Sequence, residues 1–96
     1  MLREPCVYIL ANQKNGTLYT GVTSNLRVRV WQHKEKILSG FTSTYGVNQL
    51  MWFETHESMD SAISREKQLK AGSRQKKLEL IEQLNPRWDD LFHTLG

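Results

Sequence analysis

A carboxylate occupies an apolar position in one expected helix of this sequence. Between residues 59 and 71, the apolar side chains that share one helical face are Met59, Ala62, Ile63 and Leu69. Glu66 lies at the centre of this stripe, so we expect its side chain to point inward. A buried carboxylate is costly unless it meets a cation or hydrogen-bond donors. Glu66 is therefore either half of a core salt bridge or a metal ligand or acid–base group at a cleft.

Another expected helix places two more polar groups close together. Leu26, Val30 and Ile37 form an apolar stripe, and His33 falls in the middle of it. Arg29 lies at the edge of the stripe one turn before His33, so both side chains can reach the same point. On periodicity alone, His33 is either a hydrogen-bonded core histidine or a ligand. Arg29 is either a surface cation with its stem on apolar atoms or part of the same site.

Six elements must position these groups. Asn15 and Gly16 tolerate positive φ and follow a β-prone run, which predicts an antiparallel hairpin. Ser, Thr or Asn residues stand before each expected helix as N-caps. The sequence predicts strands near 6–12, 17–22 and 49–54 and helices that begin after 25, 58 and 73 and end near 38, 71 and 84. The order β-β-α-β-α-α predicts an α/β fold of the α+β type, a small, three-stranded, mostly antiparallel sheet flanked by helices.

The composition favours a small globular protein. The chain has 96 residues, of which 39% are hydrophobic, and we expect a single domain over 1–96 with a core at about 5–84 and a short tail at 85–96. The longest apolar run, 6–11, is too short for a membrane helix or a signal peptide. A single cysteine, Cys6, excludes an internal disulfide, so a cytoplasmic protein without membrane contact is expected. No glycine-rich phosphate loop or zinc-type Cys/His spacing is found.

The charged residues are segregated along the chain. Residues 65–77 hold six basic side chains and one acidic side chain. Residues 27–36 hold four basic side chains and one acidic side chain. Residues 78–96 hold four acidic side chains and one basic one. Two basic segments suggest a polyanionic partner, although solvated helical faces would look the same. Phe41 and Tyr45, in an expected loop, are candidates for stacking on bases, whereas Trp31 and Trp52 are expected in the core.

The two strands of the hairpin carry a recognisable pair of motifs. The tripeptides VYI at 7–9 and YTG at 19–21 resemble the paired motifs of the GIY-YIG nuclease superfamily. The resemblance continues through an arginine ten residues after the second tyrosine, a histidine one turn later and a glutamate in the sequence REKQLK at 65–70. It covers about residues 5–88 and is closest to the small, single-domain bacterial type. Val22 and Leu78 stand where some members have lysine and asparagine.

The resemblance implies a metal-dependent endonuclease that hydrolyses phosphodiester bonds. One divalent cation, Mg²⁺ or Mn²⁺, would be held by Glu66, with waters and phosphate oxygens completing its shell. Arg29 would neutralise charge on the phosphate. Tyr8 and Tyr19 would position the attacking water, and His33 would either accept a proton or hold Tyr8 in place.

The resemblance also implies a nucleic acid as the partner, DNA rather than RNA, in repair or recombination. Contacts to phosphates fix register but do not read sequence, so a structure-selective or weakly sequence-selective enzyme is expected, with targeting by a partner protein as one option. The residues expected to bind nucleic acid are Gly21, Arg27, Lys67, Lys70, Arg74, Lys76 and Lys77.

Two other functions are compatible with the sequence. The first is a catalytically weak or inactive nucleic-acid-binding accessory module, which would show salt-dependent binding without metal-dependent turnover. The second is a protein-interaction domain that uses the acidic tail and Trp88 as its contact surface.

Overall fold

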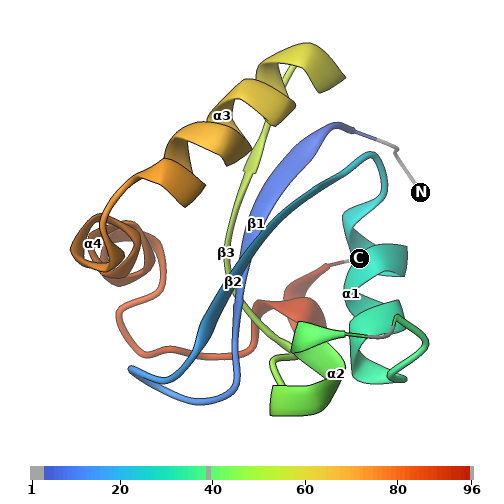
Figure 1. Ribbon diagram of the computed structural model, residues 1–96, viewed down its shortest axis with the longest axis vertical. Coiled ribbons are helices and arrows are strands. Elements are labelled where there is room, and N and C mark those ends of the chain that lie inside the picture. The colour runs from blue at the N-terminus through green and yellow to red at the C-terminus, as the bar shows by residue number, and fades with distance from the viewer. Residues whose placement is uncertain (1–3, 39, 96) are drawn as a thin grey trace.

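Three strands form one sheet at the centre of the protein. Figure 1 shows the computed structural model, in which residues 4–38 and 40–95 are described. The strands are β1 (Cys6–Ala11), β2 (Leu18–Thr23) and β3 (Gln49–Thr55). Their order is β2-β1-β3, and both neighbouring pairs are antiparallel. The predicted α+β class with a three-stranded sheet is confirmed.

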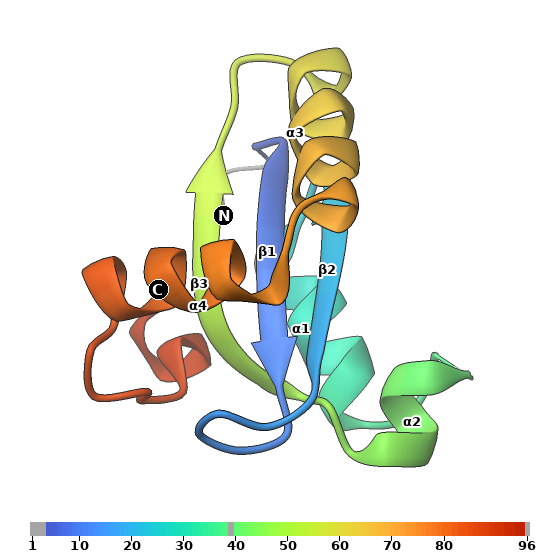
Figure 2. The same cartoon turned by 60° about the vertical axis from the view of Figure 1, so that its left-hand side comes forward.

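The helices cover both faces of the sheet. They are α1 (Leu26–Lys34), α2 (Phe41–Tyr45), α3 (Met59–Ala71), α4 (Arg74–Leu84) and a short 3₁₀ helix, η1 (Leu91–Thr94). Figure 2 shows α4 in front of the sheet and α1 behind it. The described helices are all too short and too polar to cross a bilayer.

The central strand β1 is buried along its whole length. Side chains alternate between the two faces of a strand, and here each face meets its own core. Val7, Ile9 and Ala11 pack into the cluster beneath α3 and α4. Tyr8 and Leu10 pack on the opposite face with residues of α1. The apolar run at 6–11 is therefore the strand that both layers of helices cover.

Helix α1 ends earlier than its sequence predicts. It stops at Lys34 instead of near residue 38, because Lys36 adopts the left-handed conformation with a φ of 55°. The Ile37 N–H then donates to the Gln32 carbonyl at 3.0 Å and the Lys36 N–H donates to His33 at 3.2 Å, which is the Schellman arrangement. Ile37 is 57% exposed and does not belong to the apolar stripe, whereas His33 is buried as expected.

The expected loop after α1 contains the helix that the prediction lacks. Gly40 and Gly46 bracket α2 with φ values of 107° and 64°, which glycine adopts without steric cost. The element order is therefore β-β-α-α-β-α-α.

The hairpin turn also differs in detail from the prediction. Of the two expected turn residues only Asn15 has a positive φ, of 58°. The Gly16 N–H donates to the Gln13 carbonyl at 2.9 Å, and the side-chain oxygen of Asn12 accepts from the Thr17 N–H at 2.9 Å. The loop thus spans four residues, 13–16, and this length sets the register of β1 against β2.

The residues after α4 fold back against the sheet. The Asp90 carboxylate accepts hydrogen bonds from the Leu50 and Phe92 N–H groups at 3.0 and 3.1 Å. Trp88 is only 7% exposed, and its indole N–H donates to Glu82 at 2.8 Å. The interpretation of Trp88 as an exposed contact residue is therefore wrong.

Candidate active site

Tyr8 lies at the centre of the candidate site. It is 1% exposed and lies opposite Gly21 in the register of β1 and β2. Its ring crosses directly over Gly21, because a Cβ placed on that glycine would lie 2.4 Å from the Tyr8 hydroxyl and 2.5 Å from Cζ. Gly21 is itself buried. The absence of a side chain at this position is therefore what leaves room for Tyr8.

A chain of buried hydrogen bonds fixes the Tyr8 hydroxyl. It lies 3.1 Å from Nε2 of His33, and Nδ1 of His33 lies 3.0 Å from Oγ1 of Thr42 on α2. The charge of Arg29 also acts on the Tyr8 hydroxyl. A neutral imidazole has one N–H donor and one acceptor nitrogen, so His33 donates at one of its two contacts and accepts at the other. His33 thus uses both ring nitrogens to hold its neighbours in place.

Burial sets the protonation states of this pair. It raises the pKa of Tyr8 well above its usual value, and the charge of Tyr19 adds to the rise while Arg29 opposes it. Burial lowers the pKa of His33 below 6.5, and the nearby Arg29 charge lowers it further. Tyr8 is therefore a neutral phenol and His33 a neutral imidazole near pH 7.

Tyr19 completes an aromatic cluster and reaches the surface. Its ring centroid lies 6.4 Å from that of Tyr8 and 5.6 Å from that of His33. Unlike Tyr8 it is only partly buried, and it lines an open groove. Of the two predicted tyrosines, Tyr19 is the one that a molecule in solvent can contact.

Glu66 approaches the same cluster from α3. Its side chain is 13% exposed, and its charge acts on Tyr8. The predicted inward orientation is confirmed, but the cation that Glu66 meets comes from its own helix. Lys70 lies one turn later with its Nζ 2.8 Å from Oε2 of Glu66. This hydrogen bond is the main reason why the pKa of Lys70 is raised.

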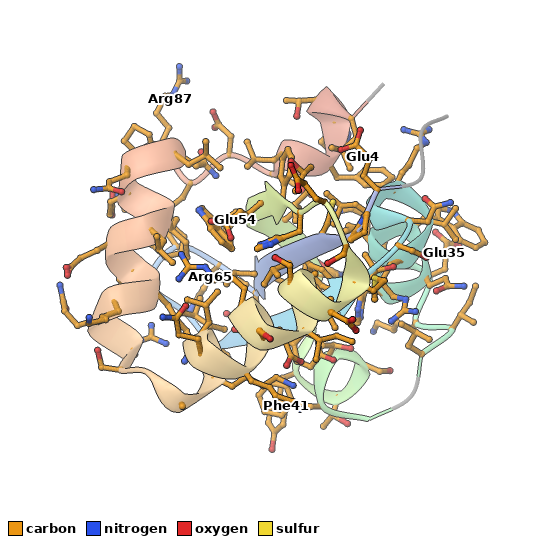
Figure 3. The ribbon with its side chains drawn as sticks, turned by 90° about the horizontal axis from the view of Figure 1, so that it is seen from above. Glu4, Glu35, Phe41, Glu54, Arg65 and Arg87 are labelled. Carbon is orange, nitrogen blue, oxygen red and sulfur yellow. The ribbon has the colours of Figure 1, made fainter. Side chains whose placement is uncertain are left out.

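Contacts between β3 and α3 fix which side of the helix faces the sheet. The Ser58 hydroxyl caps α3 by accepting from the Ser61 N–H at 3.1 Å. Oε1 of Glu54 on β3 accepts from Nε of Arg65 at 3.1 Å and lies 2.7 Å from Nε2 of His56. Figure 3 shows Glu54 and Arg65 side by side where the strand meets the helix. This anchor turns the residue after Arg65 toward the candidate site.

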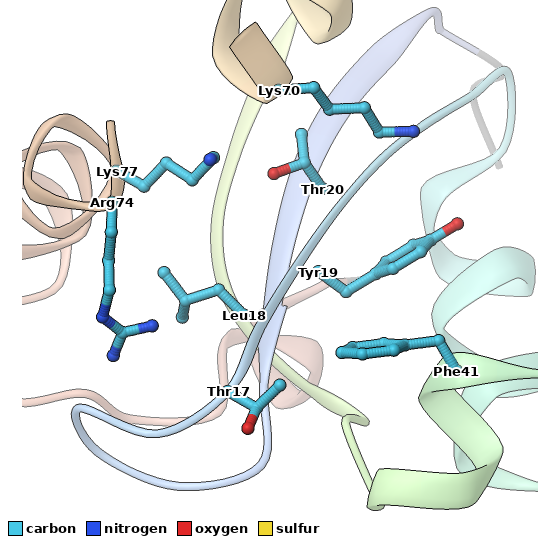
Figure 4. A pocket seen from close by; sticks show the side chains of 8 residues that line it. All are labelled: Thr17, Leu18, Tyr19, Thr20, Phe41, Lys70, Arg74 and Lys77. Atoms are coloured by element: carbon cyan, nitrogen blue, oxygen red, sulfur yellow. The ribbon is translucent and has the colours of Figure 1, made fainter. Parts of the chain in front are cut away.

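A groove of about 520 Å³ runs beside Tyr19. Figure 4 shows the aromatic side chains of Tyr19 and Phe41 on one side of it and Arg74 and Lys77 on the other, with Lys70 extending above Tyr19. The cations come from the end of α3 and from α4 and are Lys70, Arg74 and Lys77. Nη2 of Arg74 donates to the carbonyls of Asn15 and Gly16 at 2.9 and 2.7 Å, which holds it against the hairpin.

The other basic residues of the predicted nucleic-acid set lie elsewhere. Arg27 donates to the Leu95 carbonyl at 3.0 Å and lies over the Phe92 ring. Lys76 lines a separate hollow between α3 and α4, and Lys67 is exposed on α3. The structure therefore brings together three of the six predicted cations, and these three lie next to Tyr19.

Comparison with known proteins identifies the fold family. The sequence model of the GIY-YIG catalytic domain matches residues 4–79, which contain the two tyrosines, Arg29, His33 and Glu66. The chain belongs to the GIY-YIG family. It therefore carries a GIY-YIG catalytic domain, as the two hairpin motifs predict.

Small bacterial UPF0213 proteins resemble the chain over most of their length. A UPF0213 protein of Staphylococcus haemolyticus is 36% identical over 80% of this chain and 93% of the relative. One of Clostridium perfringens is 40% identical over 78% of this chain and 80% of the relative. The solution NMR structure of a UPF0213 protein from Bacillus halodurans is 28% identical, with a TM-score of 0.55, and the match covers 91% of this chain and 92% of that one.

Two residues that lie at the candidate site were not predicted there. Thr42 was not singled out, and Phe41 was considered only as a stacking candidate in a loop. Both lie on α2, which turns Thr42 toward His33 and Phe41 toward the groove. The available signal was the pair Gly40 and Gly46, whose spacing leaves room for one short helix between two left-handed residues.

Proposed function

We propose that this protein is a metal-dependent endonuclease that hydrolyses phosphodiester bonds in nucleic acid. The observation that carries the proposal is the meeting of three groups from different layers. Arg29 on α1 and Glu66 on α3 come from helices that cover opposite faces of the sheet, yet both act on Tyr8. The Tyr8 ring lies against Gly21 of the edge strand β2, next to Tyr19, which lines the groove. A guanidinium, a carboxylate and phenols beside an open cationic groove suit a phosphate ester.

The carboxylate of Glu66 is compatible with a single hard divalent cation. Among residues 4–38 and 40–95 there is no group of three His, Cys, Asp or Glu side chains placed to hold a metal. Mg²⁺ commonly takes only one or two carboxylates and fills its shell with waters and substrate phosphates, and Mn²⁺ accepts the same oxygen ligands. Glu66 alone can therefore serve as the protein ligand. When bound, such a cation supplies positive charge to the scissile phosphate and the leaving oxygen.

The two tyrosines have different parts in the proposed reaction. Tyr19, at the groove, orients the attacking water by a hydrogen bond. Tyr8 is buried and keeps its proton, so it positions Arg29 and His33. As the water oxygen bonds to phosphorus and the bond to the leaving oxygen breaks, the water gives up a proton to solvent, the leaving oxygen takes one up from solvent, and charge grows on the non-bridging oxygens. The planar N–H donors of Arg29 stabilise that charge.

The cations of the groove bind the substrate. Val22 on β2 is uncharged, so the positive charge near Tyr19 comes from Lys70 on α3. The Lys70 ammonium interacts with both Glu66 and Tyr19. Lys70, Arg74 and Lys77 would hold backbone phosphates, which gives affinity without reading sequence. DNA is the proposed substrate, in a repair or recombination setting, with selectivity for structure and targeting by a partner protein.

The test is metal-dependent cleavage of single-stranded, double-stranded, flapped and branched DNA and RNA. We expect Glu66→Gln and Arg29→Ala to lower the cleavage rate by about 100-fold or more. Glu79→Gln and Arg87→Ala are matched controls on exposed residues, and Figure 3 places Arg87 far from Phe41 and the groove. Activity that is equal in all five proteins would show contamination and would refute the proposal.

One observation favours a nucleic-acid-binding module without turnover as a second candidate. The Lys70 ammonium already pairs with Oε2 of Glu66, at 2.8 Å, so a metal would have to compete with a positive charge at this carboxylate. Salt-sensitive binding to nucleic acid together with no Mn²⁺-dependent cleavage in any substrate would support this function instead.

A further inference from the structure

Helix α2 carries two aromatic rings that the fold leaves in solvent. Phe41 and Tyr45 lie one helical turn apart, are 48% and 57% exposed, and have ring centroids 4.9 Å from one another. The helix itself is anchored, because Thr42 is buried and lies 3.0 Å from His33. The aromatic pair is therefore held at a fixed place at the rim of the candidate site.

The Phe41 ring forms a wall of the groove that Tyr19 lines. Figure 4 shows the two rings close to each other on one side of the groove. The opposite side carries Arg74 and Lys77, and the Lys70 ammonium lies above Tyr19. A flat apolar surface that shares an open groove with several cations fits a nucleotide, whose base is flat and whose phosphates are anionic.

The geometry points to Phe41 as a substrate-binding residue: we propose that its ring stacks on an unpaired nucleobase while the cations across the groove hold the adjoining phosphates. Both faces of a base inside a duplex are covered by its neighbours, so only an unstacked base can offer a face to Phe41. Strands with an unpaired nucleotide next to the cleaved phosphate are then preferred over continuous duplex. The inference rests on the proposed function for its substrate class and deepens it.

Binding measured without cleavage separates the two proposals. The probe is a short, end-labelled, mixed-sequence single strand of DNA, compared with its duplex in a buffer containing EDTA, by fluorescence anisotropy. We expect Phe41→Leu to weaken binding of the single strand by about fivefold or more and to leave duplex binding within about twofold. Phe41→Trp keeps a ring and should restore binding of the single strand. Trp31→Leu is the matched control, since Trp31 is 47% exposed on α1 and does not line the groove.

A set of single strands that each lack one base tests the stacking contact itself. Wild-type protein should bind one of these abasic strands as weakly as Phe41→Leu binds the intact strand, and Phe41→Leu should not discriminate between the two. Equal binding of the intact single strand by wild type and Phe41→Leu would overturn the inference, as would an equal loss on duplex. If Phe41→Leu is neutral but Glu66→Gln abolishes cleavage, the inference falls and the nuclease function stands. If Phe41→Leu weakens single-strand binding and no cleavage is found, the stacking contact stands and the nuclease function falls.

Discussion

Gly21 is expected to be the most sensitive position of the edge strand. A methyl group there would lie 2.4 Å from the Tyr8 hydroxyl, with other ring atoms at 2.5 and 2.9 Å. Tyr8 is 1% exposed, so protein atoms surround its ring. Gly21→Ala must therefore push the ring aside and stretch its hydrogen bond to His33.

The expected loss of stability follows from three contributions. Overpacking a filled core costs about 1–3 kcal/mol, and the weakened hydrogen bond costs about 0.5–1.5 kcal/mol more. Replacing glycine by alanine restricts the unfolded chain, which returns about 0.4–1 kcal/mol. We therefore expect Gly21→Ala to lower the free energy of unfolding by about 1–3 kcal/mol. Cleavage, if present, should fall as well, because Tyr8 carries the contacts of Arg29 and His33.

Urea unfolding at pH 7, with Gly21→Ala introduced into the wild-type protein and into Tyr8→Leu, tests whether a clash with the Tyr8 ring causes the loss of stability. In Tyr8→Leu the ring atoms that clash are gone, and the added methyl group fills part of the space left by the phenol. Gly21→Ala should then be neutral or stabilising. Gly72→Ala is the control, because Gly72 has a φ of −81° and its Cβ would come no closer than 3.4 Å to a neighbour. An equal cost of Gly21→Ala in both backgrounds would refute the steric explanation.

Two further predictions concern charge. Because burial and Arg29 hold the pKa of His33 below 6.5, the unfolded chain binds more protons than the folded one in acid, so stability should fall as the pH drops below about 6.5. Unfolding measured against pH should show a shallower fall for His33→Gln, whereas the exposed control His93→Gln should keep the wild-type slope. Lys77→Ala should reduce the slope of log affinity for the single strand against log salt concentration by about one. Lys76→Ala, outside the groove, should not change it, and equal effects of the two variants would contradict the assignment of the groove.

The parts of the fold that could be predicted are those that local sequence determines. The run at 6–11 indicated a strand, and periodicity indicated that His33 and Glu66 point inward, since each faces the apolar side of its own helix. The end of α1 could not be predicted in the same way. Its left-handed residue is Lys36, where sequence rules expect glycine, and a favourable hydrogen-bonding pattern at the helix end outweighs the strain of one lysine.

The meeting of residues from different elements depends on register, which the sequence determines only weakly. A tight turn on Asn15 and Gly16 alone would pair Tyr8 with Thr23. The four-residue loop pairs Tyr8 with Gly21 instead, and only that pairing lets the ring cross the neighbouring strand. Likewise, the sequence left the cation that pairs with Glu66 open, and the structure supplies it from Lys70 of the same helix. Short local contacts decided both outcomes.

The position of Tyr8 explains how two opposite layers can serve one site. A residue of the central strand normally faces one layer only, and the sheet separates that layer from the other. Tyr8 differs because its ring passes over Gly21 to the edge strand. The charges of Arg29, on the helix of one face, and of Glu66, on the helix of the other, both act on the same phenol. The second motif therefore contributes its glycine as much as its tyrosine. Gly21 leaves room for the Tyr8 ring of the first motif at the edge strand, and Tyr19 is the tyrosine of the pair that is accessible from the groove.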